Sequence, residues 1–365
     1  MTPKPVLVAS GHVAKFSDFI VKDSKEGTPY RADHLLEEWI DNLLEEKGLD
    51  MTEEEKSKHK LVRDKADTYE QKELEDVMLN QYKIKFPGTG NDITSPEEFN
   101  LMFSSQIGPT GKTPGFLRPE TAQGIFTNFD KLLKQNNGRM PFAAAQIGHS
   151  FRNEIAPRGG LIRVREFQMA EIEHFCEPDV REKEYNKFKY VKNVRMKFLP
   201  SEMQIGDDDN TVTCTIGEAC NKEKCPLPVP IQNTTLAYYL ARTQLFMERV
   251  GIDVVNKLRF RQHKKDEMAH YAQDCWDAEL LTSMGWIECV GHADRACYDL
   301  HQHTNATGVK LDAELFYDEP KEVIRIHKTI NKKKIGQQYK KESKPLLAYL
   351  NSLSDQDAKD LDAKL

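Results

Sequence analysis

Residues 163–175 alternate two kinds of side chain with the two-residue period of a β-strand. One parity is mostly charged or aromatic: Arg163, Arg165, Phe167, Met169, Glu171 and Glu173. The other parity is apolar at Ala170 and Ile172. We predict a hairpin in which this strand pairs with one over 151–155 across a loop at 156–160, with Ala170 and Ile172 packed against the core.

The charged face of that hairpin suits a nucleotide. Arginine guanidinium groups pair bidentately with phosphate, an aromatic ring stacks on a base, and carboxylates hold a cation or an amine. The residues alone leave a second interpretation open, which is a solvent-facing hairpin with ion pairs across its surface.

Composition narrows the class of protein. The chain has 365 residues, 39% hydrophobic and 30% charged, which is typical of a folded protein with one large domain or two. We expect no membrane span and no secretory signal, because the sequence lacks both a long apolar run and a basic-then-apolar start. Seven scattered cysteines indicate reduced thiols in a cytoplasmic protein. A net charge of −6 neither indicates nor excludes a nucleic-acid partner.

Hydrophobic spacing predicts further elements along the chain. Helices are expected over 35–44, 120–133 and 234–250 and from Pro345 onwards, with an exposed helical excursion over 51–72 that opens on a capping box at Thr52. Strands are expected over 142–148, which we take to be buried, and over 258–263 and 286–290.

Several strings of residues resemble a known family. Phe151-Arg152-Asn153-Glu154, then a loop, then Arg163 and Phe167, resembles motif 2 of class II aminoacyl-tRNA synthetases. Other strings are similar to the glycyl-tRNA synthetase family of the archaeal and eukaryotic dimeric type: Ser10-Gly11-His12, Arg118-Pro119-Glu120-Thr121, Arg259-Phe260-Arg261-Gln262-His263, Asp274-Cys275-Trp276-Asp277 and Gly285-Trp286-Ile287-Glu288. Because these strings span nearly the whole chain, the resemblance is far more specific than motif 2 alone.

The resemblance implies an α+β fold, with a class II aminoacyl-tRNA synthetase-like antiparallel sheet flanked by helices. Together with the element pattern it divides the chain into a catalytic core over 1–34, 86–176 and 231–330, a helical insertion over 35–85, a second insertion over 177–230 and a helical tail over 331–365. Motif 3, the long helix of motif 1 and the anticodon-binding domain find no match. We therefore expect a fragment or truncated copy with weak or no activity of its own.

For function, the resemblance implies an ATP-dependent glycine–tRNA ligase. Such an enzyme joins glycine to ATP as glycyl-adenylate with Mg²⁺, and then transfers glycine to tRNA(Gly). Full-length members are expected to be cytoplasmic homodimers without membrane contact. Two alternatives stay open: a non-catalytic, synthetase-like paralogue that binds tRNA or a protein, and an adenylating ligase with another acceptor.

By the same resemblance Arg152 is the catalytic residue, because its guanidinium would bridge the α-phosphate and the glycine carboxylate. The ATP site would comprise Arg152, Asn153, Glu154, Arg163, Val164, Phe167, Glu288 and Cys289, with Glu288 near the triphosphate and its Mg²⁺. The glycine site would comprise Glu120, Glu171 and Arg295, with the two carboxylates receiving the ammonium group.

Other interpretations remain for some residues. Glu120 also suits the positive end of a following helix, and Arg165 and Glu173 also suit structural ion pairs. Another open question is the group Cys214, Cys220 and Cys225, whose spacing is wider than the paired cysteines of zinc ribbons. Loop thiols are therefore favoured over a metal site.

Overall fold

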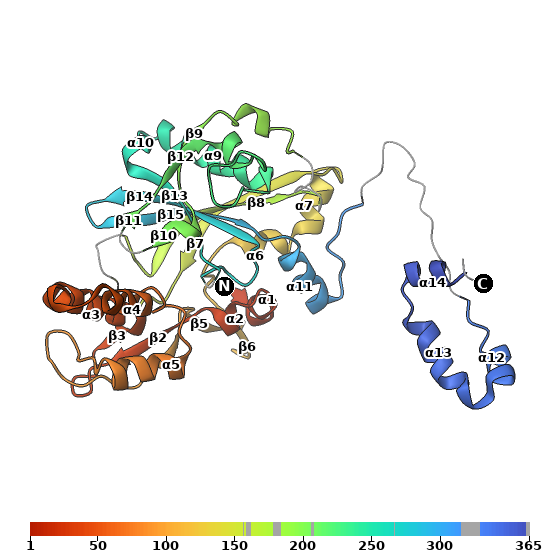
Figure 1. The fold of residues 1–365 in the computed structure, drawn as a ribbon, viewed down its shortest axis with the longest axis horizontal. Helices are drawn as coiled ribbons and strands as arrows, with labels where there is room; N and C mark the ends of the chain where they lie inside the picture. The colour runs from red at the N-terminus through yellow and green to blue at the C-terminus, as the bar shows by residue number, and fades with distance from the viewer. Residues whose placement is uncertain are drawn as a thin grey trace. The chain divides into compact units, whose positions relative to one another are not determined.

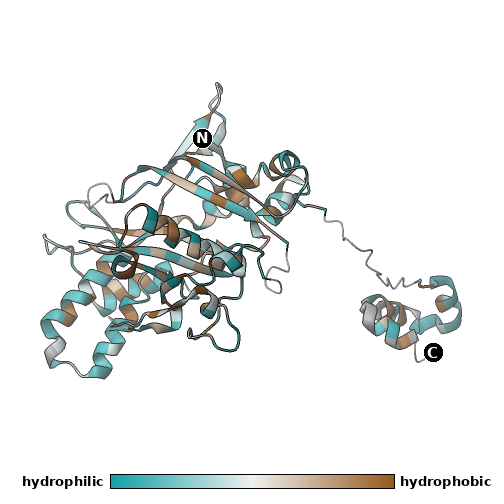
Figure 2. Cartoon of the chain, turned by 90° about the horizontal axis from the view of Figure 1, so that it is seen from above, coloured by the Kyte–Doolittle hydropathy of each residue, from teal (hydrophilic) through white to brown (hydrophobic). Residues whose placement is uncertain are grey.

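The computed structural model describes residues 1–155, 157, 162–177, 184–205, 208–265, 267–314 and 329–362. The chain forms two compact units, Met1–Ala313 and Glu314–Leu365 (Figure 1). Polar and apolar residues are interspersed along the helices and strands (Figure 2), as expected for elements that bury one side only. None of the described helices combines the length and the apolar character that a membrane crossing requires.

The N-terminal part of the larger unit combines two small sheets with a group of helices (Figure 1). Its elements are β1 Thr2–Pro3, α1 Lys4–Ala9, α2 His12–Lys15, β2 Ser17–Lys22, β3 Pro29–Arg31, α3 Ala32–Lys47, η1 Gly48–Asp50, α4 Glu53–Arg63, α5 Gln71–Glu75, η2 Asp76–Gln81, β4 Glu97–Asn100, β5 Ser104–Ile107 and β6 Thr113–Phe116. The strand orders are β1-β6-β5 and β3-β2-β4. Leu36 and Ile40 of α3, Met78 of η2 and Val21 of β2 are fully buried in one apolar core.

Helix α4 begins where the sequence predicted a capping box. The Thr52 hydroxyl accepts a hydrogen bond from the Glu55 backbone N–H, and the Glu55 carboxylate accepts one from the Thr52 backbone N–H at 2.8 Å. Two otherwise unpaired backbone donors are satisfied in this way. The predicted capping box is therefore confirmed.

A long hairpin follows in the larger unit. Its strands, β7 Phe142–Phe151 and β8 Glu166–Phe175, pair antiparallel along their whole length. Two short helices precede it, α6 Ala122–Phe126 and α7 Phe129–Gln135, where the sequence predicted one helix over 120–133. The Phe129 ring lies 5.9 Å from the Phe142 ring and 4.9 Å from the Phe175 ring, centre to centre, which anchors the hairpin to α7.

Two predictions for this hairpin were wrong. The partner strand runs over 142–151 rather than 151–155, because the chain leaves the strand at Arg152. The apolar parity lies outside the core, since Ile147 is 79% exposed and Ile172 is 59% exposed. The strand over 142–148 exists as predicted but is covered on one face only.

The covered face of the hairpin is polar because its polar groups have partners. Glu171 accepts hydrogen bonds from the backbone N–H and the hydroxyl of Thr121, immediately before α6. On the same face Phe175 packs into an apolar cluster with Phe126. Alternation in the sequence predicted the strand, but the partners on neighbouring elements decide which face is covered.

A second sheet of the larger unit has five strands in the order β12-β9-β13-β14-β15. The elements here are η3 Phe188–Tyr190, β9 Arg195–Leu199, η4 Ser201–Met203, β10 Gln204–Ile205, β11 Asp208–Asp209, β12 Val212–Thr215, α8 Ile216–Ala219, α9 Thr234–Arg249, α10 Val254–Lys257, β13 Leu258–Gln262, β14 Asp274–Thr282, β15 Gly285–Asp294 and α11 Tyr298–Thr307. Phe198, Leu240 and Phe260 are fully buried between the sheet and α9. Apart from the parallel pair β9–β13, the paired strands of the described residues run antiparallel, and helices pack on the sheets, which confirms the predicted α+β class.

The expected elements of this region are confirmed as α9, β13 and β15. Residues 177–230, predicted to be an insertion, supply β9 and β12 to the five-stranded sheet. That arrangement does not test the predicted domain boundaries, which stay a prediction.

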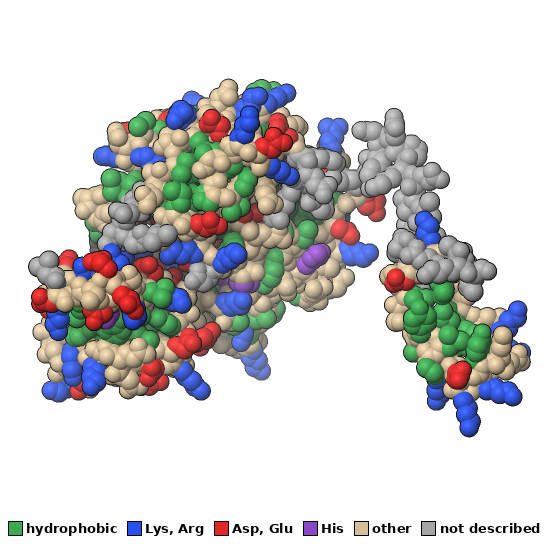
Figure 3. Space-filling model, in the orientation of Figure 1, with side chains coloured by type: hydrophobic (Ala, Val, Ile, Leu, Met, Phe, Trp, Pro, Cys, Tyr) green, Lys and Arg blue, Asp and Glu red, His purple; other side chains and the backbone are tan. Residues whose placement is uncertain are grey.

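The smaller unit is helical in its described part. Its elements are α12 Lys332–Tyr339, η5 Lys340–Glu342, α13 Ser343–Ser352 and α14 Asp355–Asp362. The helix predicted from Pro345 onwards corresponds to α13. Figure 3 shows lysine side chains beside an apolar area on this unit.

Candidate active site

A large cleft opens between β8 and β15, each of which ends its sheet. Every residue over 167–177 and 286–297 lines this cleft, so both strands turn a backbone edge towards it as well as side chains. Its volume is about 1840 Å³, which is larger than a typical small-molecule site. The cleft therefore has room for a nucleotide together with a second substrate.

Arg152 lies between two aromatic rings in the cleft. Its Cζ atom is 5.5 Å from the centre of the Phe16 ring and 5.6 Å from the centre of the Phe167 ring. Its backbone N–H donates to the Arg165 carbonyl at 3.0 Å, and its Nε faces the Pro119 carbonyl at 3.5 Å. The rings orient the guanidinium, and no hydrogen bond of its terminal N–H groups is recorded among the described residues, which suits an anion.

Three further residues of the predicted ATP site line the cleft, namely Glu154, Arg163 and Val164. Asn153 does not line it, and its backbone N–H donates to the Leu101 carbonyl at 2.7 Å. The Arg165 guanidinium donates to the Glu154 carbonyl at 3.0 and 3.1 Å, which ties together the two ends of the intervening loop. The loop predicted at 156–160 falls outside the described residues, except for Pro157.

Glu120 is a buried carboxylate held by two donors. Its Oε1 atom lies 2.5 Å from Gln123 Nε2 and 3.3 Å from His12 Nε2. Burial opposes ionisation of Glu120, but His12, Arg295 and Gln123 together hold its pKa at about 2. Both donors use Oε1, so Oε2 has no protein partner within the described residues.

Glu171 is held in a similar way. Its Oε2 atom accepts from the Thr121 backbone N–H at 2.6 Å and from the Thr121 hydroxyl, while its Oε1 atom has no hydrogen bond recorded in the described ranges. Burial and then the charge of nearby Glu120 raise the pKa of the Glu171 carboxyl. Two neighbouring carboxylates with one oxygen each to spare form a site for a cation with several N–H donors.

Arg295 brings positive charge to these carboxylates. Its Nε and Nη2 donate to Asp299 at 2.7 and 2.9 Å, and its Cζ lies 3.6 Å from the centre of the Tyr271 ring. Burial opposes the charge of Arg295, but the pair with Asp299 outweighs it and raises the guanidinium pKa. Since Asp299 occupies two of its N–H groups, Arg295 acts on Glu120 and Glu171 through its charge.

Glu173 belongs to the same acidic cluster. Burial raises its pKa to about 8, with Arg295 opposing the shift and Glu171 adding to it. The Glu173 carboxyl is therefore mostly protonated at pH 7. No ion pair of this residue is recorded in the described part of the chain.

Glu288 and Cys289 lie at a β-bulge. Glu288 pairs with Glu279 and Val290 pairs with Ala278, so Cys289 is the extra residue of β15. The Cys289 thiol donates to the Ala278 carbonyl at 3.0 Å, and burial raises its pKa to about 11. The thiol is therefore protonated and unreactive at neutral pH.

Burial raises the pKa of the Glu288 carboxyl, and the nearby Asp277 raises it further, whereas His263 and Arg152 lower it. A Cβ atom placed on Gly291 would lie 3.6 Å from Glu288 Oε1 and 3.7 Å from Asp277 Oδ1. Both carboxylate oxygens therefore lie near the Gly291 backbone, and Mg²⁺ takes oxygen ligands from one or two carboxylates plus phosphate. The residues present therefore fit a magnesium ion that arrives with a nucleotide.

His263 forms an ion pair with Asp277. Its Nε2 lies 2.6 Å from Asp277 Oδ2, and hydrogen bonds to Asp277 and Cys275 raise its pKa to about 10. These three residues bring possible ligand atoms within 4.8 Å of one another. With its imidazole protonated, His263 stabilises the charge of Asp277 beside it.

Comparison with known families identifies the fold. Residues 111–337, more than half of the chain, match the family "tRNA synthetase class II core domain (G, H, P, S and T)". The chain belongs to this family. The predicted resemblance to class II synthetases is thereby confirmed.

Relatives of this class II core carry a more specific name. A glycine–tRNA ligase of Caenorhabditis elegans is 48% identical over 365 residues, covering 100% of this chain and 47% of the relative. Glycine–tRNA ligases of Drosophila melanogaster (51% identical, covering 97% of this chain and 45% of the relative) and Methanocaldococcus jannaschii (43%, covering 98% and 57%) are also similar. The chain spans about half the length of these curated relatives.

Sequence reasoning missed several residues of this class II core that contact the predicted site. They are His12, Phe16, Thr121, His263 and Asp277. Except for Phe16, all lie in the sequence strings that carried the resemblance. Membership of those strings was the signal that could have identified them. Phe16 carried no such signal, because its contact with Arg152 depends on the tertiary fold.

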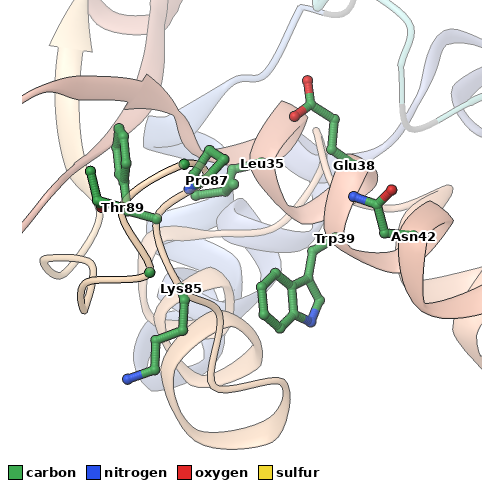
Figure 4. A pocket seen from close by; sticks show the side chains of 10 residues that line it. Leu35, Glu38, Trp39, Asn42, Lys85, Pro87 and Thr89 are labelled. Atoms are coloured by element: carbon green, nitrogen blue, oxygen red, sulfur yellow. The ribbon is translucent and has the colours of Figure 1, made fainter. Parts of the chain in front are cut away.

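A second hollow of the class II core, about 400 Å³, lies between α3 and the loop over 85–90 (Figure 4). Leu35, Glu38, Trp39 and Asn42 line it from the helix. The Glu38 carboxylate accepts a hydrogen bond from the Tyr30 hydroxyl at 2.7 Å. This hollow contains none of the predicted site residues.

The three neighbouring cysteines belong to the apolar core of the class II domain. Cys214 is buried there, and Cys220 and Cys225 pack against it. Burial raises the pKa values of Cys214 and Cys220 to about 11 and 12. Among the described residues they form no metal-binding group, which agrees with protonated thiols.

Proposed function

We propose that this chain is the glycine-activating part of a glycine–tRNA ligase. The observation that carries the proposal is the pair Glu120 and Glu171, each with one oxygen held and the other available, in the same cleft as Arg152 and Phe167. An ammonium group and a nucleotide phosphate are therefore expected side by side. Relatives named glycine–tRNA ligase, at 43–51% identity, support the choice of amino acid.

In the proposed first step, a carboxylate oxygen of glycine attacks the α-phosphorus of ATP. The bond between the α-phosphorus and the bridging oxygen breaks, and pyrophosphate leaves with the electron pair. Glycine's carboxylate is ionised at neutral pH, so no general base is needed. Arg152 reduces the repulsion between the two anions and aligns them, which is the main requirement of such a displacement.

For recognition, the ammonium group of glycine would donate to Glu120 Oε2 and Glu171 Oε1, the two oxygens for which the described residues supply no partner. The positive charge of the ligand would relieve the repulsion that raises the pKa of Glu171. A larger amino acid would have to place its side chain against the wall around these carboxylates, which is costly in a packed site.

The nucleotide would lie with adenine on Phe167 and its phosphates towards Arg152 and Arg163. Glu288 and Asp277 would hold Mg²⁺, which supplies charge neutralisation to the phosphates when bound. Cys289 would contribute through its backbone, because its side chain is bonded to Ala278. Asn153 would fix the strand end rather than contact ATP, since it does not line the cleft.

The proposal extends to the whole protein. Transfer of glycine to tRNA(Gly), a homodimer and a cytoplasmic location follow from the same assignment. A relative in Saccharomyces cerevisiae carries "mitochondrial" in its name, so cellular fractionation is the direct test of location.

The catalytic role of Arg152 is tested by glycine-dependent exchange between ATP and pyrophosphate. Arg152→Ala should lower the exchange rate on the order of 100-fold, because it removes the cation that aligns two anions. Arg139→Ala, which changes an exposed arginine outside the cleft, serves as the control and should leave the rate unchanged. Exchange by wild type above background that Arg152→Ala retains at an equal rate would refute the assignment.

A further inference from the structure

The corner between α1 and α2 contacts two residues of the proposed site. His12, the first residue of α2, lies 3.3 Å through its Nε2 from Glu120 Oε1. Phe16, which ends the same helix, has its ring centre 5.5 Å from Arg152 Cζ. The His12 and Phe16 rings are 5.6 Å apart, so one helical turn spans the glycine-binding and nucleotide-binding groups.

His12 donates to Glu120 whether or not it carries a positive charge. Its Nδ1 lies 2.8 Å from Ser10 Oγ, which also faces the Leu7 carbonyl at 3.4 Å. Because the Glu120 carboxylate can only accept, Nε2 carries a proton, and Nδ1 then either accepts from the Ser10 hydroxyl in the neutral ring or donates to it in the charged ring. In both cases the proton on Nε2 faces Glu120.

The position of His12 also decides which oxygen of Glu120 is used. His12 and Gln123 both contact Oε1, so the second oxygen remains for a ligand. His12 and Ser10 are themselves almost inaccessible to solvent. A buried donor with a fixed partner on its far side holds the carboxylate in one orientation.

Close packing fixes the corner. Gly11 has a φ of +84°, and a Cβ atom there would come within 2.6 Å of His270 Nε2. The Tyr298 hydroxyl would be 3.5 Å away. Only a residue without a side chain allows this approach, so the chain turns here at one defined angle.

We infer that His12 and Phe16 are positioning residues for the two substrates: His12 orients Glu120 for the ammonium group, and Phe16 orients Arg152 for the phosphate. The inference rests on the proposed function, because it assigns supports to that same site. Neither residue touches the reacting atoms. Their effects are separable, since each supports a different part of the ligand.

Two probes separate these effects in equilibrium titrations of the 365-residue chain. One is glycyl sulfamoyl adenosine, a hydrolysis-resistant mimic of glycyl-adenylate, and the other is sulfamoyl adenosine without the glycyl group. His12→Leu, which has no donor, should weaken the glycyl probe on the order of tenfold and leave the other within twofold, because the hydrogen bond that orients Glu120 is lost and only the glycyl probe uses Glu120. Phe16→Leu should weaken both probes by the same factor.

Control variants and folding measurements distinguish weaker binding from loss of the folded state. His301→Gln changes an exposed histidine on α11 and should alter neither titration. Ser10→Ala, which removes only the far partner of His12, should weaken the glycyl probe by a smaller factor. Far-ultraviolet circular dichroism and the melting temperature report whether each variant is folded.

The outcomes point to different errors. Suppose that wild type binds both probes and that His12→Leu and Ser10→Ala are folded. If these variants lose both probes equally, or lose neither, the inference about His12 is wrong. If wild type and a folded Phe16→Leu bind both probes with equal affinity, the inference about Phe16 is wrong. Wild type that binds neither probe contradicts the proposed function itself, and the inference falls with it.

Discussion

The acidic cluster around Arg295 holds more carboxyl groups than cations. Four carboxyl groups lie close to one another here, namely Glu120, Glu171, Glu173 and Asp299. Arg295 is hydrogen-bonded to Asp299. A cluster of this kind relieves repulsion by keeping one carboxyl protonated, and the raised pKa of Glu173 indicates where that proton resides. An incoming ammonium group would therefore meet a site with unbalanced negative charge.

Glu173 should make stability depend on pH. In the unfolded chain its carboxyl ionises near pH 4.3, whereas in the folded protein its pKa is about 8. Between these values the folded state binds more protons, so its contribution is fully present below about pH 4 and is lost as the pH rises through 8. Compared with Glu173→Gln, wild type should lose up to about 1.4 kcal/mol per pH unit across that window.

The measurement is urea unfolding at several pH values between 5 and 8. Glu248→Gln, at an exposed position on α9 with no ion pair recorded among the described residues, is the control and should show the slope of wild type. Parallel pH profiles for wild type and Glu173→Gln would mean that Glu173 is ionised in the folded protein.

At the scale of elements, sequence patterns predicted which segments form but not always which side they bury. Capping at Thr52 and the apolar spacing over 234–250 are local signals, and the corresponding α4 and α9 are present. The hairpin differed, because a face with Glu171 is covered when Thr121 supplies donors from another part of the chain. Which face of a strand is covered depends on tertiary contacts, and the sequence of the strand alone does not determine it.

The candidate site shows the same difference between local sequence signals and tertiary contacts. Motif 2 placed Arg152 and Phe167 close together in sequence, and the structure brings them together in space. His12 and Asp277 are far from motif 2 along the chain, and their contacts depend on how the sheets pack. Residue type and spacing therefore predicted the groups that would bind ligand better than the groups that support them.

Two isoleucine substitutions, one in the core and one on the hairpin, test whether the outer face of the hairpin is packed. Ile216→Ala removes a fully buried side chain of α8 and should lower the free energy of unfolding by about 2–5 kcal/mol. Ile147→Ala, at the 79% exposed position on β7, should change it by no more than about 0.5 kcal/mol. Urea titration of both variants against wild type gives the comparison. A large loss for Ile147→Ala would show that the outer face is packed after all.

At the scale of the whole molecule, the larger unit contains every residue predicted to bind ligand. Its cleft is bounded by two strand edges, so ligand binding and the spacing of the two sheets are linked. Membership of the class II core family accounts for the sheets and their helices. The choice of glycine rests on the acidic pair and on the named relatives, and it is the part that most needs a direct measurement.

That measurement is the affinity of the 365-residue chain for hydrolysis-resistant aminoacyl-adenylate analogues by isothermal titration calorimetry. Glycyl and alanyl forms differ by one methyl group, so the comparison isolates the amino-acid end of the cleft. We expect the glycyl form to bind at least about tenfold more tightly, because the methyl group must displace a packed wall. Equal affinity for the two forms, or no binding of the glycyl form, would contradict it.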